Sequence, residues 1–284
     1  MNIAEILEQL DITITPADII LGSAGVILLC IWLIKYSFGT KALADSPPRR
    51  NNMPIYLPIL FLTIWIILAA GGLQIINSLG KTAGLAQWQK ELLIYSSMSL
   101  SQFVLIFLML FVGWRFFAGR LKGFGFCFRT VGKDLAAAIV NLVAILPVVA
   151  GMMLLVGFLG RLIEGEQFQI QQNEGLTTII SYPQLSVRIV VFIFAGVIVP
   201  VFEELIFRGL FQSMLRSAIC KAWPAIILSS VLFSILHPWT HWPALFAFSL
   251  CLGYSYEKSG SMFRPIFIHA LFNIIMLAAA LNSG

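Results

Sequence analysis

Long stretches of apolar residues, separated by short polar segments, set the pattern of this chain. Eight such runs can be followed, at residues 18–38, 54–76, 92–114, 135–159, 187–207, 223–236, 242–256 and 264–281. A helix needs about 20 residues to cross about 30 Å of hydrocarbon. Most of the runs approach that length, and the sixth and seventh are the shortest. The pattern predicts an all-α, polytopic transmembrane helical bundle of about eight helices.

Composition agrees with this prediction. The 284 residues are 59% hydrophobic and only 11% charged, with a mean hydropathy of +0.93, whereas an average soluble domain is about one-quarter charged. The chain is therefore expected to be an integral membrane protein. Its cysteines, Cys30, Cys127, Cys220 and Cys251, form no CxxC pair. Isolated cysteines inside or beside apolar runs are read as small apolar residues, not as disulfide partners or metal ligands.

The basic residues favour one set of alternating loops. That set contains Lys35, Lys41, Arg49, Arg50, Arg115, Arg120, Lys122, Arg129, Lys133, Arg216, Lys221, Lys258 and Arg264, and the other set only Lys81, Lys90, Arg161 and Arg188. By the positive-inside rule the rich set is cytoplasmic, which places both termini outside a membrane that we expect to be the cytoplasmic membrane of a prokaryote. This distribution explains the net charge of +5 without a nucleic-acid partner.

Three polar segments suggest how the chain is organised. Residues 46–52 include a Pro-Pro pair and two arginines, and they predict an exposed cytoplasmic linker. Residues 160–186 form the longest polar external segment, which either connects two spans or covers a site from outside. Residues 119–132 form a second basic loop. We expect an N-terminal transmembrane scaffold over residues 1–132 and a core over residues 133–284 that holds the intramembrane polar groups.

The intramembrane polar groups lie in the last spans. They are Glu203, Glu204, Arg208, His237, His269 and Asn273. An ionisable group in hydrocarbon costs several kcal/mol, so such groups usually face a protein interior and mark a functional site. Glu204 and Arg208 are four residues apart with the acid first, which favours an ion pair on one helix. Glu203 lies about 100° around that helix, and one guanidinium for two carboxylates leaves it uncompensated and suited to accept a proton.

The remaining groups complete a plausible catalytic set. His269 and Asn273 are also four residues apart and therefore share one helix face. His237 ends the sixth run, one turn after Phe233, whose ring we read as packing. If the chain turns near Cys220, then Glu203 and His237 lie at similar depth; His269 joins them only if the helix after Arg208 projects further or bends. A carboxylate, two imidazoles and a carboxamide in a dry pocket suit hydrolysis of an amide.

The three segments resemble the motifs of a known family. Glu203-Glu204-x-x-x-Arg208, Phe233-x-x-x-His237 and His269-x-x-x-Asn273, in this order and each on an expected span, are similar to those of the CPBP family. That family comprises type II CAAX prenyl proteases and the Abi, bacteriocin-processing and lysostaphin-resistance-like intramembrane proteases. The resemblance covers residues 187–281. It implies an intramembrane endopeptidase whose partner is a membrane-associated peptide or protein, either a prenylated CAAX-type or a leader-peptide substrate.

The resemblance also implies roles for individual residues. Glu203 would activate water with His237 beside it, His269 and Asn273 would form the oxyanion site, and Glu204 with Arg208 would shape and neutralise the pocket. Members of the family have also been described as metalloproteases, in which case Glu203, His237 and His269 would be the zinc ligands. The sequence has no HExxH motif and shows no partners to orient such ligands. We therefore favour a glutamate-type hydrolase with no cofactor.

Other functional classes could use the same charges. A membrane transporter also carries ionisable residues inside its spans, but transporters often contain inverted repeats, and here the charges are confined to the C-terminal half. A non-catalytic immunity or scaffold protein could use them as a structural ion network between helices. Such a protein should tolerate Glu203→Gln.

Overall fold

The computed structural model describes residues 15–46 and 48–283, so residues 1–14, Pro47 and Gly284 lie outside the described part of the chain. Within that part the protein is helical, and one isolated antiparallel bridge joins Asn51 to Phe117. The all-α prediction is confirmed. The elements are α2 (Pro16–Lys35), α3 (Leu57–Thr82), α4 (Gln87–Phe116), α5 (Arg120–Phe124), η1 (Phe128–Thr130), α6 (Val131–Glu164), α7 (Glu174–Ser181), α8 (Leu185–Ile193), η2 (Phe194–Ile198), α9 (Val199–Glu204), η3 (Leu205–Gln212), α10 (Ser213–Ile219), α11 (Ala222–Ile235), η4 (Trp239–His241), α12 (Trp242–Ser259) and α13 (Phe263–Ser283).

Six helical segments in the described residues are long and apolar enough to cross a membrane. They are Pro16–Lys35, Leu57–Thr82, Gln87–Phe116, Phe128–Glu164, Leu185–Ile219 and Phe263–Asn282. The sixth and seventh expected spans correspond to α11, which is shorter, and α12, which buries polar residues such as Ser249 and Glu257. α11 is apolar and exposes Ile227, Leu228 and Ile235, but it has only 14 residues, whereas α12 packs largely against other helices of the protein. A count of eight spans is therefore not confirmed.

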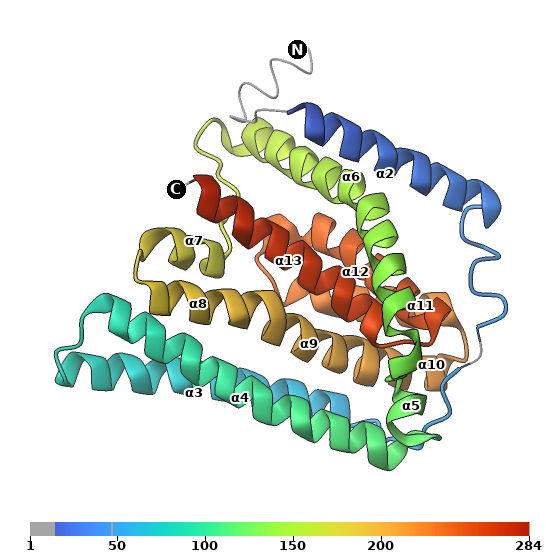
Figure 1. Ribbon diagram of the computed structural model, residues 1–284, viewed down its shortest axis with the longest axis horizontal. Coiled ribbons are helices and arrows are strands. Elements are labelled where there is room, and N and C mark those ends of the chain that lie inside the picture. The colour runs from blue at the N-terminus through green and yellow to red at the C-terminus, as the bar shows by residue number, and fades with distance from the viewer. Residues whose placement is uncertain (1–14, 47, 284) are drawn as a thin grey trace.

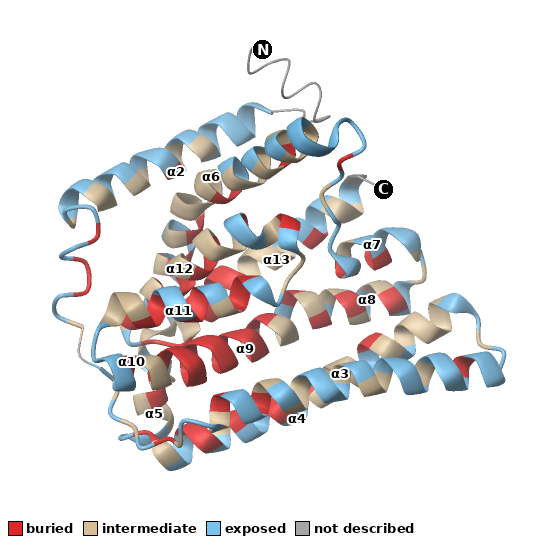
Figure 2. Ribbon diagram, turned by 180° about the vertical axis from the view of Figure 1, so that it is seen from behind, coloured by how far each residue is buried: buried red, intermediate tan, exposed pale blue. Residues whose placement is uncertain are grey.

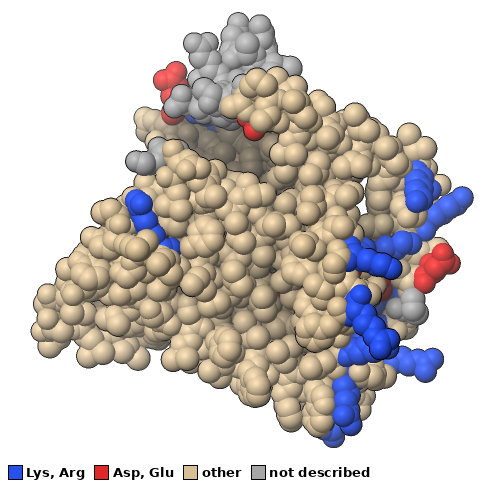
Figure 3. Space-filling model, in the orientation of Figure 1, with Lys and Arg blue, Asp and Glu red and all other residues tan. Residues whose placement is uncertain are grey.

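Successive long helices run in opposite directions, so the start of α2 and the end of α13 lie at the same end of the molecule (Figure 1). The loops predicted to be rich in Lys and Arg meet at the opposite end, near α5 and α10, where Figure 3 shows basic side chains gathered. We call this the basic end. The six spans make the chain an integral membrane protein; that the basic end faces the cytoplasm stays a prediction.

The helices of the N-terminal half flank the helices that carry the intramembrane charges. α2 packs along α6, where a Cβ atom on Gly25 would collide with the Val143 carbonyl and the Pro147 ring; small residues allow such close helix contacts in membranes. α3 pairs with α4, and α4 packs against α8, η2 and α9. Burial is densest on α9 and its continuation toward α10, whereas α2, α3 and α4 expose much of their surface (Figure 2).

The segment between α2 and α3 is more strongly attached than an exposed linker would be. We call residues 37–46 and 48–53 the strap. Ala42 and Leu43 are buried against Ile226, and the backbone carbonyl of Ala42 accepts a hydrogen bond from Lys258 Nζ at 2.8 Å. Asn51 Nδ2 donates to Ser217 Oγ at 2.9 Å. The strap thus lies at the surface but is tied to α10, α11 and α12.

The polar segment 160–186 contains more structure than its composition suggests. α7 begins after Asn173, whose side chain caps the helix by accepting from the Gly175 amide at 2.9 Å. Phe168 is buried and its ring lies 6.0 Å from that of Trp239. Because Trp239 follows His237 by two residues, this segment covers the loop beside one candidate site residue.

Candidate active site

One irregular helical stretch, Leu185–Ile219, carries Glu203, Glu204 and Arg208. The two glutamates end the short α9, which lies between two π-helical segments, η2 and η3. π-helical turns are rare and frequently occur at functional sites, because they change the direction in which neighbouring side chains point. The local geometry therefore singles out the same position as the charge pattern.

Pro200 explains how η2 is connected to the last helix. The Val199 amide donates to the carbonyl of Phe194, five residues earlier. The next bond in that register would join residue 200 to the carbonyl of Ala195, but proline has no N–H. Asn273 Nδ2 donates to that carbonyl instead, at 2.8 Å. In membranes, backbone groups freed by proline need such a partner, so Asn273 ties α13 to the helix that carries Glu203.

Glu204 and Arg208 form the predicted ion pair. Glu204 Oε2 lies 3.1 Å from Arg208 Nε, and Arg208 Nη1 donates to Glu204 Oε1 at 3.2 Å. The guanidinium also donates to Ser249 Oγ at 2.8 Å and to the Ser249 carbonyl at 3.2 Å. Both charged side chains are buried in a region of low dielectric constant. Removal of either one would leave the other as an uncompensated buried charge.

Glu203 faces the two imidazoles of the other motifs. Its Oε1 lies 4.0 Å from His237 Nε2 and its Oε2 lies 3.7 Å from His269 Nε2. Both separations are too long for direct hydrogen bonds, and at such distances a bridging water is the usual link. Glu203 is buried, whereas 27% of the His237 side chain remains exposed. The site is therefore closed on the Glu203 side and open beside His237.

The depth of His269 is explained by unequal helix ends. Met262, just before α13, packs against Gly209 of η3. A Cβ atom added to Gly209 would lie only 3.2 Å from Met262 Cε. The helix that carries Glu203 then continues past Gly209 to Ile219. This helix therefore projects beyond the start of α13, which is the condition under which His269 was expected to meet Glu203. His269 consequently lies at the same depth as Glu203.

Each imidazole is oriented by a second partner through its other nitrogen. His237 Nδ1 lies 2.8 Å from the Phe233 carbonyl, and His269 Nδ1 lies 2.8 Å from Glu204 Oε1. Both Nε2 atoms therefore point toward Glu203. Backbone carbonyls and carboxylates are also the usual partners of zinc-bound histidines, so the absence of such partners no longer argues against a metal. The side chains of Glu203, His237 and His269 are of the types that bind Zn²⁺, but among the described residues no three His, Cys, Asp or Glu side chains are placed so that they could hold a metal ion.

Phe233 forms the wall of the site, as its packing interpretation predicted. The ring is buried and lies 4.8 Å from the His237 ring and 6.0 Å from the His269 ring. The Arg208 guanidinium carbon lies 4.9 Å from the ring centroid, a distance at which the aromatic face attracts a cation. Phe233 thus shields this side of the site from water and packs against His237, His269 and Arg208.

A ladder of polar contacts extends from Arg208 to the basic end. Its rungs are Arg208–Ser249, Gln212–Gly253 and Arg216–Glu257, each separated by 41 residues. A constant separation means that the two helices run parallel, and the four-residue step means that the rungs line one face of each. We call this set of contacts the polar ladder. It fixes the register between α12 and the helix that bears the glutamates.

Sequence reasoning missed the partners that hold the site residues. Ser249, the Ala195 carbonyl and the Phe233 carbonyl belong to ordinary apolar stretches and carry no motif. The repeated four-residue spacing of Ser249, Gly253 and Glu257, parallel to that of Arg208, Gln212 and Arg216, was the available signal. These matching spacings predict contacts only when the two helices are known to lie side by side.

Comparison with known proteins identifies the region that contains the site. Residues 185–275 match the family of type II CAAX prenyl endopeptidases, Rce1-like, whereas no curated protein and no solved structure matched the chain. The matched region begins with α8 and includes all three motifs. This agrees with the similarity to the CPBP family found in the motifs themselves. Residues 185–275 of the chain are thus similar to the Rce1-like family of type II CAAX prenyl endopeptidases.

Proposed function

We propose that the protein is an intramembrane endopeptidase that hydrolyses a peptide bond of a membrane-associated substrate, of the prenylated CAAX type or a leader peptide. The observation that carries this proposal is the position of Glu203, whose oxygens lie 3.7 and 4.0 Å from two imidazole nitrogens. A water that bridges these groups would be held next to a carboxylate able to take its proton. The family match to a group of prenyl endopeptidases supports the same reaction.

In the proposed reaction Glu203 acts as a general base. The water oxygen bonds to the substrate carbonyl carbon while one water proton moves to Glu203. The C–N bond then breaks as Glu203 returns that proton to the leaving nitrogen, which leaves a carboxylic acid and an amine. His237 orients the water from the exposed side. Glu204 and Arg208 hold His269 in position, and Phe233 keeps bulk water out.

The developing oxyanion requires hydrogen-bond donors. We assign this role to His269 and Asn273, as the family similarity implies. One N–H of the Asn273 carboxamide is already used by the Ala195 carbonyl, so the second would serve the oxyanion. Such a donor contributes roughly 10²–10³ in rate. Asn273 would then act both as a catalytic donor and as the link between α13 and η2.

These two roles of Asn273 can be separated by experiment. We expect Asn273→Ala to lower both the free energy of unfolding, by about 1 kcal/mol because the half-buried Ala195 carbonyl loses its partner, and the rate of peptide cleavage. Pro200→Ala restores an N–H that can reach that carbonyl. In the Pro200→Ala background, Asn273→Ala should therefore lose the rate but little stability, measured by thermal unfolding and peptide cleavage. Full recovery of the rate would contradict an oxyanion role.

We further propose that the reaction needs no metal. The Glu203 carboxylate can itself accept the proton of the water, and the 2.8 Å contact between His269 Nδ1 and Glu204 Oε1 orients the other ring nitrogen of His269 toward Glu203. If Zn²⁺ were bound instead, Glu203, His237 and His269 would hold it and it would supply the Lewis acidity that activates water.

Chelation provides the corresponding test. Cleavage by the purified protein should be unchanged after incubation with 1,10-phenanthroline, and metal analysis should find no stoichiometric zinc. A non-chelating isomer of the phenanthroline serves as the control for nonspecific inhibition. Loss of cleavage that added Zn²⁺ restores would contradict the metal-free proposal.

The substrate class is tested with paired peptides. Purified protein in detergent is offered fluorogenic peptides that differ only in a lipid on one cysteine, alongside leader-type peptides. Cleavage of any of them that is lost in Glu203→Gln supports the proposed endopeptidase, and preference for the lipidated form assigns a prenylated substrate.

In this scheme residues 1–132 act as a scaffold, because α3 and α4 pack beside the helix that bears Glu203.

A further inference from the structure

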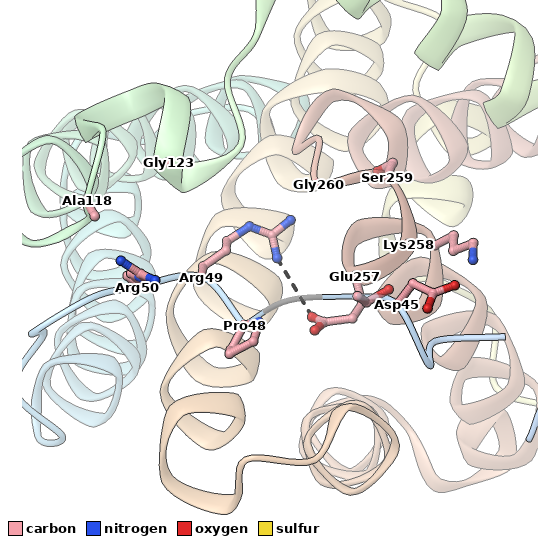
Figure 4. Close-up of a pocket in the computed structure, with 11 residues that line it drawn as sticks. Asp45, Pro48, Arg49, Arg50, Ala118, Gly123, Glu257, Lys258, Ser259 and Gly260 are labelled. Atoms are coloured by element: carbon pink, nitrogen blue, oxygen red, sulfur yellow. Dashed lines mark ion pairs between the residues drawn. The ribbon is translucent and has the colours of Figure 1, made fainter. Parts of the chain in front are cut away.

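A second polar site lies at the basic end of the molecule, away from the proposed catalytic groups. A cleft of about 500 Å³ opens between the strap, α5 and the C-terminal end of α12 (Figure 4). Its charged lining residues are Asp45, Arg49, Arg50, Glu257 and Lys258. Glu257 is also the last acceptor of the polar ladder. The cleft and the proposed active site are thus connected through one helix pair but use different residues.

Within residues 15–46 and 48–283, the buried charges beside this cleft are not balanced. Glu257 Oε1 lies 2.8 Å from Arg216 Nε and its Oε2 lies 3.7 Å from Arg49 Nη1. The side chains of Arg49 and Arg216 are only 11% and 9% exposed. Two largely desolvated guanidiniums therefore share one carboxylate. An excess charge in such surroundings is costly unless an anion joins it.

The hydrogen bonds of the two arginines confirm that they are fixed in place. Arg49 donates to the Tyr256 carbonyl at 2.9 Å and its guanidinium lies 3.5 Å from the centre of the Tyr256 ring. Arg216 Nη2 donates to the Ser46 carbonyl at 3.0 Å, while its buried Nη1 has no hydrogen-bond partner among the described residues. These arginines cannot turn outward to solvent without breaking the strap contacts.

The exposed lining adds further positive charge. Arg50 and Lys258 are exposed, as is Asp45, the single exposed acid of the described lining. With Glu257 shared by Arg49 and Arg216, the cleft and its supporting residues carry four cations and two carboxylates. Arginine and lysine together are the usual partners of phosphate oxygens, the first as a planar fork and the second as a point charge.

The position of the cleft favours a lipid as the source of that phosphate. Trp114 lies in the last turn of α4 and Tyr56 directly precedes α3, and both are exposed at the basic end. Trp and Tyr at the ends of membrane spans lie at the level of the lipid headgroups. The cleft, flanked by the same helix ends, is consequently at the depth of the lipid phosphates.

We propose that this cleft binds a phosphate group, supplied by the headgroup of an anionic membrane lipid. The phosphate neutralises the excess charge of Arg49 and Arg216 and bridges the strap to α12. Binding should therefore stabilise the attachment of the strap. This inference does not depend on the protease proposal, because it concerns residues outside the catalytic set.

The test uses full-length protein in detergent and a matched pair of double variants. Arg50→Gln/Lys258→Gln removes two cations of the cleft, whereas Lys122→Gln/Arg129→Gln removes two exposed cations from the same end but outside it. Thermal unfolding is followed during titration with short-chain phosphatidylglycerol, phosphatidylcholine or inorganic phosphate. The cleft variant should bind phosphatidylglycerol about 25-fold more weakly, at roughly fivefold for each cation, and the control pair should behave as wild type.

Each outcome decides the proposal. Stabilisation by phosphatidylglycerol but not phosphatidylcholine, lost only in the cleft variant, supports a lipid phosphate. Equal stabilisation by inorganic phosphate, again lost only in the cleft variant, supports the phosphate site but assigns free phosphate as its source. Equal loss of this stabilisation in both double variants would overturn the proposal. No stabilisation of the wild type by either phosphatidylglycerol or inorganic phosphate would overturn it as well. Unfolding without additives checks that both variants are folded, and native mass spectrometry detects retained lipid independently.

Discussion

Replacement of Glu203 by glutamine is expected to lower kcat for peptide cleavage by roughly 10²–10⁴, the usual contribution of a general base. Glutamine keeps the shape of the side chain but cannot take a proton from water. Its thermal stability should be equal to that of wild type or slightly higher. The reason is that Glu203 is the carboxylate without a direct hydrogen bond to an imidazole, at 3.7 and 4.0 Å, so its removal leaves no partner unpaired.

Two further glutamate variants make this result specific. Glu204→Gln should lose both stability and activity, because Glu204 is the acceptor for Arg208 and His269. Glu164→Gln, exposed at the end of α6, should lose neither. A non-catalytic scaffold would tolerate Glu203→Gln. Cleavage by Glu203→Gln at the wild-type rate would remove Glu203 from the mechanism.

Replacement of Arg208 by methionine is expected to cost about 3–5 kcal/mol of unfolding free energy, because it leaves the buried Glu204 carboxylate uncompensated. Arg208 is 1% exposed and Glu204 is 0% exposed, so water cannot take the place of the guanidinium. Methionine preserves most of the length of the side chain and its packing against Phe233. The measurement is thermal or denaturant unfolding of the purified variant in the same detergent as wild type.

A double variant separates the charge from the packing. Glu204→Gln/Arg208→Met removes both charges and should recover most of the stability that Arg208→Met loses, since replacing a buried pair is often close to neutral. It should not recover activity, because His269 has then lost the carboxylate that orients it. Lys122→Met, on the exposed surface, is the control and should change stability by less than about 0.5 kcal/mol. Additive losses in the double variant would contradict the coupling of the pair.

The long helices could be predicted because lipid imposes a simple rule on their sequence. A segment that faces hydrocarbon must be apolar over its whole length, and α2, α3, α4 and α6 follow from this rule. α11 could not be settled in the same way because it has only 14 residues, and α12 could not because it buries polar residues such as Glu257. α7 is too short to produce a clear period, and its position depends on the Asn173 cap.

The site could be predicted in part because its charged groups have no other reason to lie inside a membrane. The Glu204–Arg208 pair follows from helical spacing alone. The convergence of Glu203, His237 and His269 follows from the three motifs. Their supporting contacts could not be predicted. The Ala195 carbonyl becomes available only because of the register of η2 around Pro200. The orientation of His269 depends on Glu204, a contact between distant helices.

The strap illustrates a different limit of sequence reasoning. Its prolines and arginines correctly predict a position at the surface, but composition does not reveal that Arg49 lies over the Tyr256 ring. Nor does it reveal that Ala42 is buried against α11. Both features depend on which helix ends meet at the basic end. Contacts between segments about 200 residues apart require the packed structure.

If Glu203 and two imidazoles hold the attacking water, an experimental structure in lipid at high resolution should show it. We expect one water-sized density peak within about 3 Å of Glu203, His237 Nε2 and His269 Nε2, a normal hydrogen-bond distance. Anomalous scattering collected at the zinc edge should give no signal at this peak. A Glu203 carboxylate that faces the acyl chains, beyond reach of both imidazoles, would rule out Glu203 as the base.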